Sequence, residues 1–217
     1  MTCIAIDGPS GSGKSTVSKI LARKLGFVNV DTGALYRGIA YYFYVNNVDF
    51  RKIENLTKIL KDINIQIENS NYDQRIFLNG EDITDNIRSE EISKVASEIS
   101  ALSEVRSHLL KLQREIAKNR NVVMDGRDIG TVVIPDAKVK IFLTASPQLR
   151  AKRRYEQLNE KVSYEEVLKD INKRDENDSN REICPLKKSE DAIIFDNSSY
   201  TLEETANRLL EIIKERV

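Results

Sequence analysis

The chain has 217 residues and carries 34 basic and 34 acidic side chains, so its formal net charge is zero. A zero net charge excludes a global field that would recruit nucleic acid or an anionic membrane, and any basic site must be local. Hydrophobic residues make up 40% of the chain, enough for a sizeable core and too many for a disordered protein. The apolar runs are far too short to span a membrane. We therefore expect a globular protein that binds neither nucleic acid nor membrane.

The cysteines and the start of the chain bear on the compartment. Cys3 and Cys184 are the two cysteines, far apart and without the spacing of a metal site. The first apolar run follows Met1 almost directly, with no pattern typical of a signal peptide. We therefore expect reduced thiols and a cytoplasmic location.

Short apolar runs alternate with helical patterns along the chain. Buried strands are predicted at residues 3–6, 27–31, 121–125, 138–144 and 192–196. A helix is predicted from Lys14 onward, and further helices over roughly 90–119, 147–159, 163–175 and 202–216. This alternation predicts an α/β fold in which a five-stranded parallel sheet is flanked by helices.

One segment departs from this alternation. Residues 63–84 read INIQIENSNYDQRIFLNGEDIT, with a period of two and turn signals at residues 69–71 and 79–80. This pattern predicts a small antiparallel β meander. We expect it to form an inserted subdomain over residues 49–85, with residues 1–48 and 86–217 forming the core.

The loop after the first predicted strand indicates a phosphate-binding site. Residues 8–15 read GPSGSGKS and match the P-loop pattern G-x-x-x-x-G-K-[ST] between a strand and a helix. Glycines give such a loop its backbone freedom, and its N–H groups converge on phosphate oxygens at the helix N-terminus. Lys14 is expected to reach the β- and γ-phosphates, and the Ser15 hydroxyl to bind Mg²⁺. The residues expected to bind a nucleoside triphosphate are Gly8, Pro9, Ser10, Gly11, Ser12, Gly13, Lys14, Ser15 and Thr16.

The use of the triphosphate must be inferred from other segments. The chain has no N-K-x-D tetrapeptide that would read guanine, which disfavours a switch GTPase. A kinase needs a second anion-binding site that faces the P-loop, and arginine-bearing segments are plentiful here.

The segment DTGALYRG follows the second predicted strand. Asp31 and Thr32 are good helix N-caps, and Arg37 lies about a turn further on, where its guanidinium can hold a phosphate. The same residues also fit a plain helix cap followed by a solvated arginine. This segment alone does not decide between the two interpretations.

The segment MDGRDIGT ends the strand predicted at 121–125, where ligands bind in open α/β sheets. Arg127 and Asp128 fit either a ligand loop or a surface ion pair, and the flanking glycines favour the ligand loop. Two further basic segments, LRAKRRYEQL and KRDENDSNR, fit either solvated helix faces or groups that contact a transferring phosphoryl group. The second of these is expected to be mobile. Their polar candidates are Arg150, Arg153, Arg154, Arg174, Asp178 and Arg181.

In this order, GPSGSGKS, DTGALYR, LNGEDIT, DGRDIGT and KRDENDSNR closely resemble the motifs of bacterial cytidylate kinases, and the resemblance covers nearly the whole chain. It implies a P-loop kinase with a monophosphate-binding insert and a lid over about residues 150–185. It also implies transfer of a phosphoryl group from ATP to CMP or dCMP with Mg²⁺, small-molecule partners and a monomer.

The resemblance also implies roles for individual residues. The acceptor phosphate would meet Arg37, Arg127 and Arg181. The base would meet Ser97, Arg106 and Asp128, with Thr32 nearby. The ribose would meet Asp178, which Arg174 holds. Lys14 and a lid arginine, here assigned to Arg153, would neutralise the moving charge.

The base assignment predicts selectivity. Cytosine offers an amino donor that a carboxylate such as Asp128 can accept, whereas uracil presents an acceptor at that position. We expect discrimination against UMP of about tenfold or more. Two alternatives stay open at this point: a P-loop kinase of another small acceptor such as UMP, and a non-enzymatic binding module that uses ATP as a switch.

Overall fold

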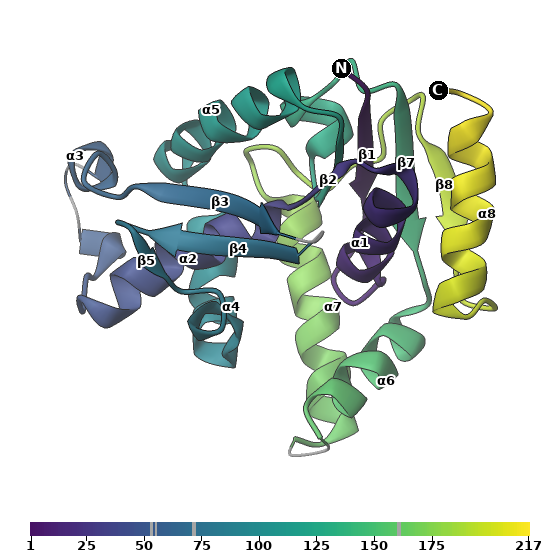
Figure 1. Cartoon of the computed structure of the whole chain (residues 1–217). Coiled ribbons are helices and arrows are strands. Elements are labelled where there is room, and N and C mark those ends of the chain that lie inside the picture. The colour runs from purple at the N-terminus through teal and green to yellow at the C-terminus, as the bar shows by residue number, and fades with distance from the viewer. Residues whose placement is uncertain (53, 55, 71–72, 160–161) are drawn as a thin grey trace.

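The computed structural model describes residues 1–52, 54, 56–70, 73–159 and 162–217. Its centre is a parallel sheet of five strands in the order β2-β6-β1-β7-β8 (Figure 1). The strands are β1 (Cys3–Asp7), β2 (Val28–Asp31), β6 (Val122–Gly126), β7 (Val139–Thr144) and β8 (Ile193–Asp196). All of the strands predicted for this sheet are confirmed, with bounds that agree to within one residue at either end.

Helices cover both faces of the sheet, as the alternation predicts. On one face, Ile4 and Ile6 of β1 pack with helices α1 (Lys14–Leu25) and α8 (Leu202–Lys214). On the other face, Ala5 and its neighbours pack with helix α5 (Ser103–Asn119) and the turn η3 (Ile129–Val133). Burying both faces explains why these strands are continuous apolar runs.

The predicted meander is confirmed as a separate antiparallel sheet in the order β3-β4-β5. Its strands are β3 (Ile65–Ser70), β4 (Asp73–Leu78) and β5 (Glu81–Asp82). Of the two predicted turns, the first includes residue 71, and residues 71–72 lie outside the described residues. The segment before this sheet contains η1 (Phe50–Lys52) and α3 (Leu56–Leu60).

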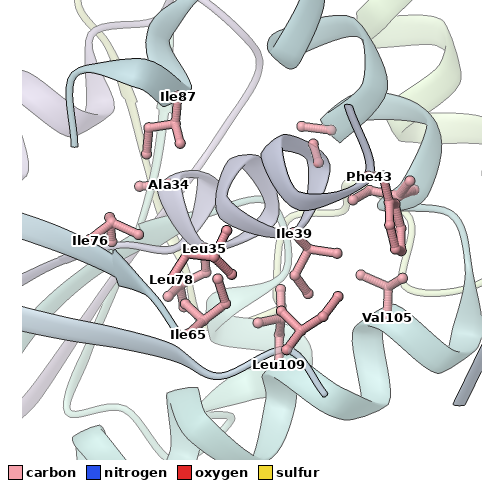
Figure 2. Close-up of a cluster of buried hydrophobic side chains, with 14 of the residues drawn as sticks. Ala34, Leu35, Ile39, Phe43, Ile65, Ile76, Leu78, Ile87, Val105 and Leu109 are labelled. Carbon is pink, nitrogen blue, oxygen red and sulfur yellow. The ribbon is translucent and has the colours of Figure 1, made fainter. Parts of the chain in front are cut away.

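Helix α2 (Thr32–Val45) joins this small sheet to the core. Figure 2 shows Ile65, Ile76 and Leu78 of the sheet beside Leu35 and Ile39 of α2. Val105 and Leu109 of α5 belong to the same cluster. Burying each such side chain stabilises the fold by about 1.5–3 kcal/mol. Because the small sheet and α5 both contribute side chains to this cluster, α2 is packed from two directions. Its first turns, which carry Thr32 and Arg37, are thereby placed between the insert and the core.

The single helix predicted over 90–119 is wrong. The chain forms α4 (Glu90–Ile99) and α5, with an interruption at residues 100–102 where Leu102 is extended (φ −83°, ψ 125°). The apolar residues Ile99, Leu102 and Val105 keep helical spacing across the break because all of them pack on the same cluster. Periodicity alone therefore could not reveal it. The short turn η2 (Asn86–Arg88) precedes α4.

Helices α6 (Pro147–Gln157) and α7 (Tyr164–Asn180) pack against each other through Ala151, Val167 and Ile171 (Figure 1). Residues 160–161, within the expected lid, lie outside the described residues. Helix α7 continues to Asn180, beyond the predicted end at 175, so Asp178 is helical and buried rather than part of an irregular segment. No helix in the described part of the chain combines the length and apolarity needed to cross a membrane.

Candidate active site

Polar residues gather where parallel strands end. Asp7 ends β1, Asp31 ends β2, and Asp125 lies one residue before the end of β6. Because neighbouring parallel strands end at the same edge of a sheet, these carboxylates and the loops after them share one region. In the sheet register Asp31 pairs with Asp125, and Asp7 pairs with Gly126.

The P-loop connects β1 to α1. A side chain at Gly8 would place its Cβ 2.0 Å from the backbone oxygen of Leu143 on β7, so only glycine fits there. Gly13 is the N-cap of α1 in the left-handed region (φ 89°), and no side chain in the described part of the chain caps this helix. By contrast, α2, α4, α6, α7 and α8 are capped by Asp31, Ser89, Ser146, Ser163 and Thr201. The first N–H groups of α1 are thus not taken by a cap and suit a phosphate.

Lys14 lies buried beneath this loop. Its Nζ donates to the Pro9 carbonyl oxygen at 2.7 Å and to Ser12 Oγ at 3.3 Å. Burial lowers the pKa of the Lys14 ammonium, and the nearby Arg127 lowers it further, while the Asp125 carboxylate opposes both. An anion bound beside Lys14 would remove this cost, because it favours the charged form.

Ser15 and Asp125, which lie 110 residues apart in the sequence, form a hydrogen-bonded pair. Ser15 Oγ donates to Asp125 Oδ2 at 2.8 Å. Burial raises the pKa of Asp125 to about 7, and the charge of Asp31 adds to the rise. The other oxygen, Asp125 Oδ1, is buried and has no hydrogen-bond partner in the described residues. The acidic end of the strand 121–125 was visible in the sequence, but only the strand order shows that it faces the P-loop.

The oxygen atoms of Ser15 and Asp125 are suited to binding a metal ion. A hydroxyl oxygen and a carboxylate with a free oxygen are hard ligands of the kind that Mg²⁺ prefers alongside substrate phosphates. In the described residues no group of three or more His, Cys, Asp or Glu side chains could hold a metal. The residues present therefore fit an ion held largely by the nucleotide rather than a cage built by the protein.

The DTGALYR segment lies beside this pair. Thr32 Oγ1 donates to the Asp125 backbone oxygen at 2.8 Å, which ties the start of α2 to β6. Arg37 Nη2 donates to Asp31 Oδ2 at 2.9 Å, while Asp31 Oδ1 caps α2 at Ala34 N. Arg37 is therefore not a solvated arginine, because it pairs with Asp31 and its Nε is buried. It is also not fully paired, because this Nε has no hydrogen-bond partner in the described residues.

The predicted base-binding residues Arg106 and Asp128 are brought together. Arg106 Nη2 pairs with Asp128 Oδ2, and both side chains are less than 10% exposed. Arg106 Nη1 also donates to the Ser100 carbonyl oxygen at 3.0 Å, an acceptor that the break between α4 and α5 provides. The guanidinium lies 5.8 Å from the centroid of the Tyr36 ring.

A second ion pair joins the loop after β6 to the end of α7. Arg127 Nε donates to Asp178 Oδ2 at 2.7 Å, and Arg181 Nη1 lies 3.8 Å from Asp178 Oδ1. Burial raises the pKa of Asp178, but the charges of Arg127, Arg181 and Arg174 outweigh it and the pKa is lowered. Burial lowers the pKa of Arg174 to about 10, and Arg127 contributes to this.

Several of these guanidinium groups are buried without full hydrogen bonding. Within the described residues, unpartnered buried nitrogens occur on Arg37 (Nε), Arg106 (Nε), Arg174 (Nε) and Arg181 (Nη2). A buried donor without an acceptor costs about 1–3 kcal/mol. Such a concentration of unsatisfied cationic donors in one region is what an anionic ligand would relieve.

Helix α6 contacts the P-loop through its arginines. Arg150 Nη1 donates to the Ser10 carbonyl oxygen at 3.0 Å and pairs with Asp175 of α7. Arg153 Nη1 approaches the Ser12 carbonyl oxygen at 3.4 Å and Asn197 Oδ1 at 3.2 Å. Both arginines therefore lie beside the P-loop, and Arg150 connects the expected lid to it.

Ser97 is the predicted site residue with the weakest connection to this network. It is half-buried on α4, and its backbone oxygen accepts from Ser100 Oγ. Ser100 Oγ in turn accepts from Arg181 Nη1 at 3.4 Å. The structure thus links Ser97 to the cluster only indirectly, and Ser100 is the serine that contacts its arginines.

Comparisons with known proteins bear on the family to which the chain belongs. The sequence profile of the cytidylate kinase family matches residues 4–215. A cytidylate kinase of Caldicellulosiruptor saccharolyticus is 47% identical over 212 residues, which are 96% of this chain and 94% of that protein. A cytidylate kinase of Thermosipho melanesiensis is 50% identical over 220 residues, covering 100% and 99% of the two chains.

A solved structure supports the fold alone. The crystal structure of an uncharacterized protein from Eubacterium ventriosum superposes with a TM-score of 0.56 over 100% of both chains, at 14% identity.

Proposed function

The chain belongs to the cytidylate kinase family, so it is an enzyme that phosphorylates CMP or dCMP, and we propose how its own residues divide that work. The reaction converts ATP and CMP to ADP and CDP, with dCMP giving dCDP. Cleavage of the bond between the γ-phosphorus and its bridging oxygen accompanies attack by an oxygen of the acceptor phosphate. The acceptor is already an anion near neutral pH, so no general base is required.

The donor half is the P-loop. The triphosphate is proposed to lie at the uncapped N-terminus of α1, with Lys14 at its β- and γ-phosphates. Mg²⁺ would be held by Ser15 and Asp125 and would neutralise charge on the phosphate oxygens. Arg153, which approaches the P-loop from α6, adds positive charge on the same side.

The acceptor half is the arginine cluster, and its unpartnered buried donors are the observation that carries the proposal. Arg37, Arg127 and Arg181 are proposed to hold the acceptor phosphate. Asp178 would accept hydrogen bonds from the ribose hydroxyl groups, and the charge of Arg174 lowers the pKa of this carboxylate. Catalysis then consists mainly of positioning the two nucleotides and stabilising the charge of the transferred group.

The base is proposed to meet Arg106 and Asp128, with Ser97 and Thr32 nearby. Arg106 occupies Asp128 Oδ2, which leaves Oδ1 as the acceptor for the 4-amino group of cytosine. Uracil presents an oxygen at that position, and two acceptors facing each other leave a buried polar pair unsatisfied. This arrangement favours CMP over UMP as the acceptor.

The insert and the lid are proposed to close over the nucleotides. Residues 49–85 would approach from the side of α2, and residues 150–185 from the side of α7. Closure excludes water, so the enzyme should hydrolyse ATP only slowly without an acceptor. Because all proposed contacts come from a single chain, a monomer suffices. The free state of Cys3 and Cys184 supports the proposed cytoplasmic location.

An acceptor screen tests the proposal. ADP release would be measured with ATP and Mg²⁺ and each of CMP, dCMP, UMP, AMP and GMP, for the unsubstituted enzyme and for Lys14→Ala. We expect rapid turnover with CMP and dCMP, weak turnover with UMP, and a loss of about a hundredfold or more in Lys14→Ala. Equal turnover of UMP and CMP would contradict the base site. Release of ADP without any acceptor dependence would favour the ATP-switched module instead.

A further inference from the structure

The turn that follows β6 is capped by a side chain from another strand. Both carboxylate oxygens of Asp7, at the end of β1, accept backbone N–H bonds of 2.8 Å, one from Ile129 and one from Gly130. These N–H groups begin the π-helical turn η3 and have no acceptor earlier in the turn. Asp7 is only 5% exposed, so this bidentate contact lies in the protein interior.

Asp128 occupies the position from which such a turn is usually capped. An aspartate at an N-cap commonly folds its carboxylate back onto the backbone N–H groups that follow it. Asp128 makes no such bond and instead pairs with Arg106. Asp7 already occupies the Gly130 N–H, one of the two groups that an N-cap side chain usually bonds, and the carboxylate of Asp128 turns instead to Arg106 at the proposed acceptor site.

The other end of the turn is also held from outside. Arg114 on α5 donates from Nη2 to the Val132 carbonyl oxygen at 2.8 Å and from Nε to the Val133 carbonyl oxygen at 3.1 Å. A carboxylate at the N-terminal end and a guanidinium at the C-terminal end both favour the dipole of the turn. The turn is therefore fixed at both ends by side chains that do not belong to it.

We propose that Asp7 is a positioning residue for recognition of the acceptor base, because it caps η3 from β1 and so keeps the Asp128 carboxylate turned toward Arg106 and the cytosine. This inference rests on the proposed role of Asp128. It assigns a function in acceptor selectivity to a residue of the strand that leads into the ATP-binding loop.

Asp7 also lies near Lys14, so two routes of action must be separated. Burial is the largest influence on the Lys14 pKa, and Asp7 is among the carboxylates that oppose its effect. An effect of Asp7 through Lys14 would change the KM for ATP, or kcat with every acceptor alike. An effect through Asp128 would change kcat/KM for CMP relative to UMP and leave the KM for ATP in place.

A double-mutant cycle tests the proposal. The ratio of kcat/KM for CMP to that for UMP would be measured for the unsubstituted enzyme, Asp7→Asn, Asp128→Asn and the double variant. In Asp7→Asn the new side chain offers one acceptor oxygen, and its amide donor opposes a backbone N–H. We expect Asp7→Asn to lower the ratio by about tenfold and to leave the KM for ATP within about twofold. In the Asp128→Asn background the same substitution should change the ratio little, because coupled residues are not additive.

The outcomes separate the proposal from the function on which it rests. An unchanged ratio in Asp7→Asn, or an equal fall with and without Asp128, overturns the positioning role while the base site stands. If Asp128→Asn alone leaves the ratio unchanged, the base assignment fails and the proposal fails with it.

A second variant covers the case in which Asp7→Asn does not fold. Arg114→Gln removes both donors at the opposite end of η3, and Arg114 is an exposed residue remote from Lys14 in the sequence. We expect it to lower the CMP to UMP ratio by about threefold, and Arg120→Gln, at the exposed end of the same helix, to leave it unchanged. An unchanged ratio in Arg114→Gln would then overturn the proposal.

Discussion

Arg127 donates its Nε to Asp178 Oδ2 at 2.7 Å and thereby connects the loop after β6 to the last turn of α7. The contact crosses from the sheet edge to the proposed lid, and Arg181 lies on the other oxygen of the same carboxylate. A single carboxylate thus organises two of the arginines proposed to hold the acceptor phosphate.

Replacing Asp178 should weaken the acceptor site in particular. Asp178→Asn removes the charge between Arg127 and Arg181 and one acceptor for the ribose. Because hydrogen bonds to charged groups contribute about 1.5–3 kcal/mol, we expect the KM for CMP to rise about tenfold or more, with a small change in the KM for ATP. Steady-state kinetics with each substrate varied in turn would measure both. Glu176→Gln, an exposed carboxylate on the same helix, is the matched control. An equal rise in both KM values would contradict the assignment.

Replacing Asp128 should shift the choice of base. In Asp128→Asn the amide nitrogen can donate to the oxygen of uracil, whereas the carboxylate can only accept. We expect kcat/KM for CMP to fall, that for UMP to hold or rise, and their ratio to drop by about tenfold or more. Competition assays with both acceptors present would report the ratio directly. Asp136→Asn, exposed just after the same turn, should keep the original ratio. If both variants behave alike, Asp128 does not read the base.

The buried carboxylate of Asp125 should make stability depend on pH. Burial raises its pKa from 3.8 to about 7, so the folded state binds this proton more tightly than the unfolded state. The associated stability is fully present below about pH 4 and is lost as the pH rises through about 7. Asp125→Asn removes this loss. We therefore expect the melting temperature of the variant minus that of the unsubstituted enzyme to increase from pH 4 to pH 8. The kinase activity of the variant should be lower than that of the unsubstituted enzyme.

Thermal unfolding without nucleotide, at intervals across this range, would measure the effect. A difference between the two melting temperatures that stays flat with pH would show that Asp125 does not titrate in this window. The pKa of Asp7 is also raised, to about 6, mainly by burial. Asp7 is present in both proteins, so its contribution cancels in the difference.

Gln74 should couple the insert to the acceptor site. Its Oε1 accepts from Asp31 N at 2.8 Å and its Nε2 donates to the Asp31 carbonyl oxygen at 3.1 Å, which docks β4 onto the start of α2. Gln74→Ala removes both bonds, each contributing about 1 kcal/mol. We expect the KM for CMP to rise about threefold to tenfold with kcat nearly unchanged, whereas Gln66→Ala, exposed on the adjacent strand, should have no effect. A fall in kcat without a change in KM would argue against this docking role.

Local pattern was sufficient for the strands and for locating the P-loop segment. Strands such as 121–125 and the meander at 63–84 are set by burial and by a period of two, which neighbouring residues show on their own. The P-loop is a contiguous segment, so its glycines, Lys14 and Ser15 were visible together. The break at residues 100–102 was missed because the apolar spacing runs through it unchanged.

The acceptor half depended on tertiary structure. Its residues come from segments far apart in the sequence, such as Arg127 with Asp178 and Arg106 with Asp128, and the resemblance named them without pairing them. The contacts of Asp125 with Ser15 and of Asp7 with Ile129 arise only because β1 and β6 are adjacent and parallel. Residue types and spacing thus determined the strands and the loop at which a triphosphate is proposed to bind. The strand order decided which charged groups lie close together. A buried charge must be paired with a group nearby in space, and the sheet determines which chain segments are adjacent there.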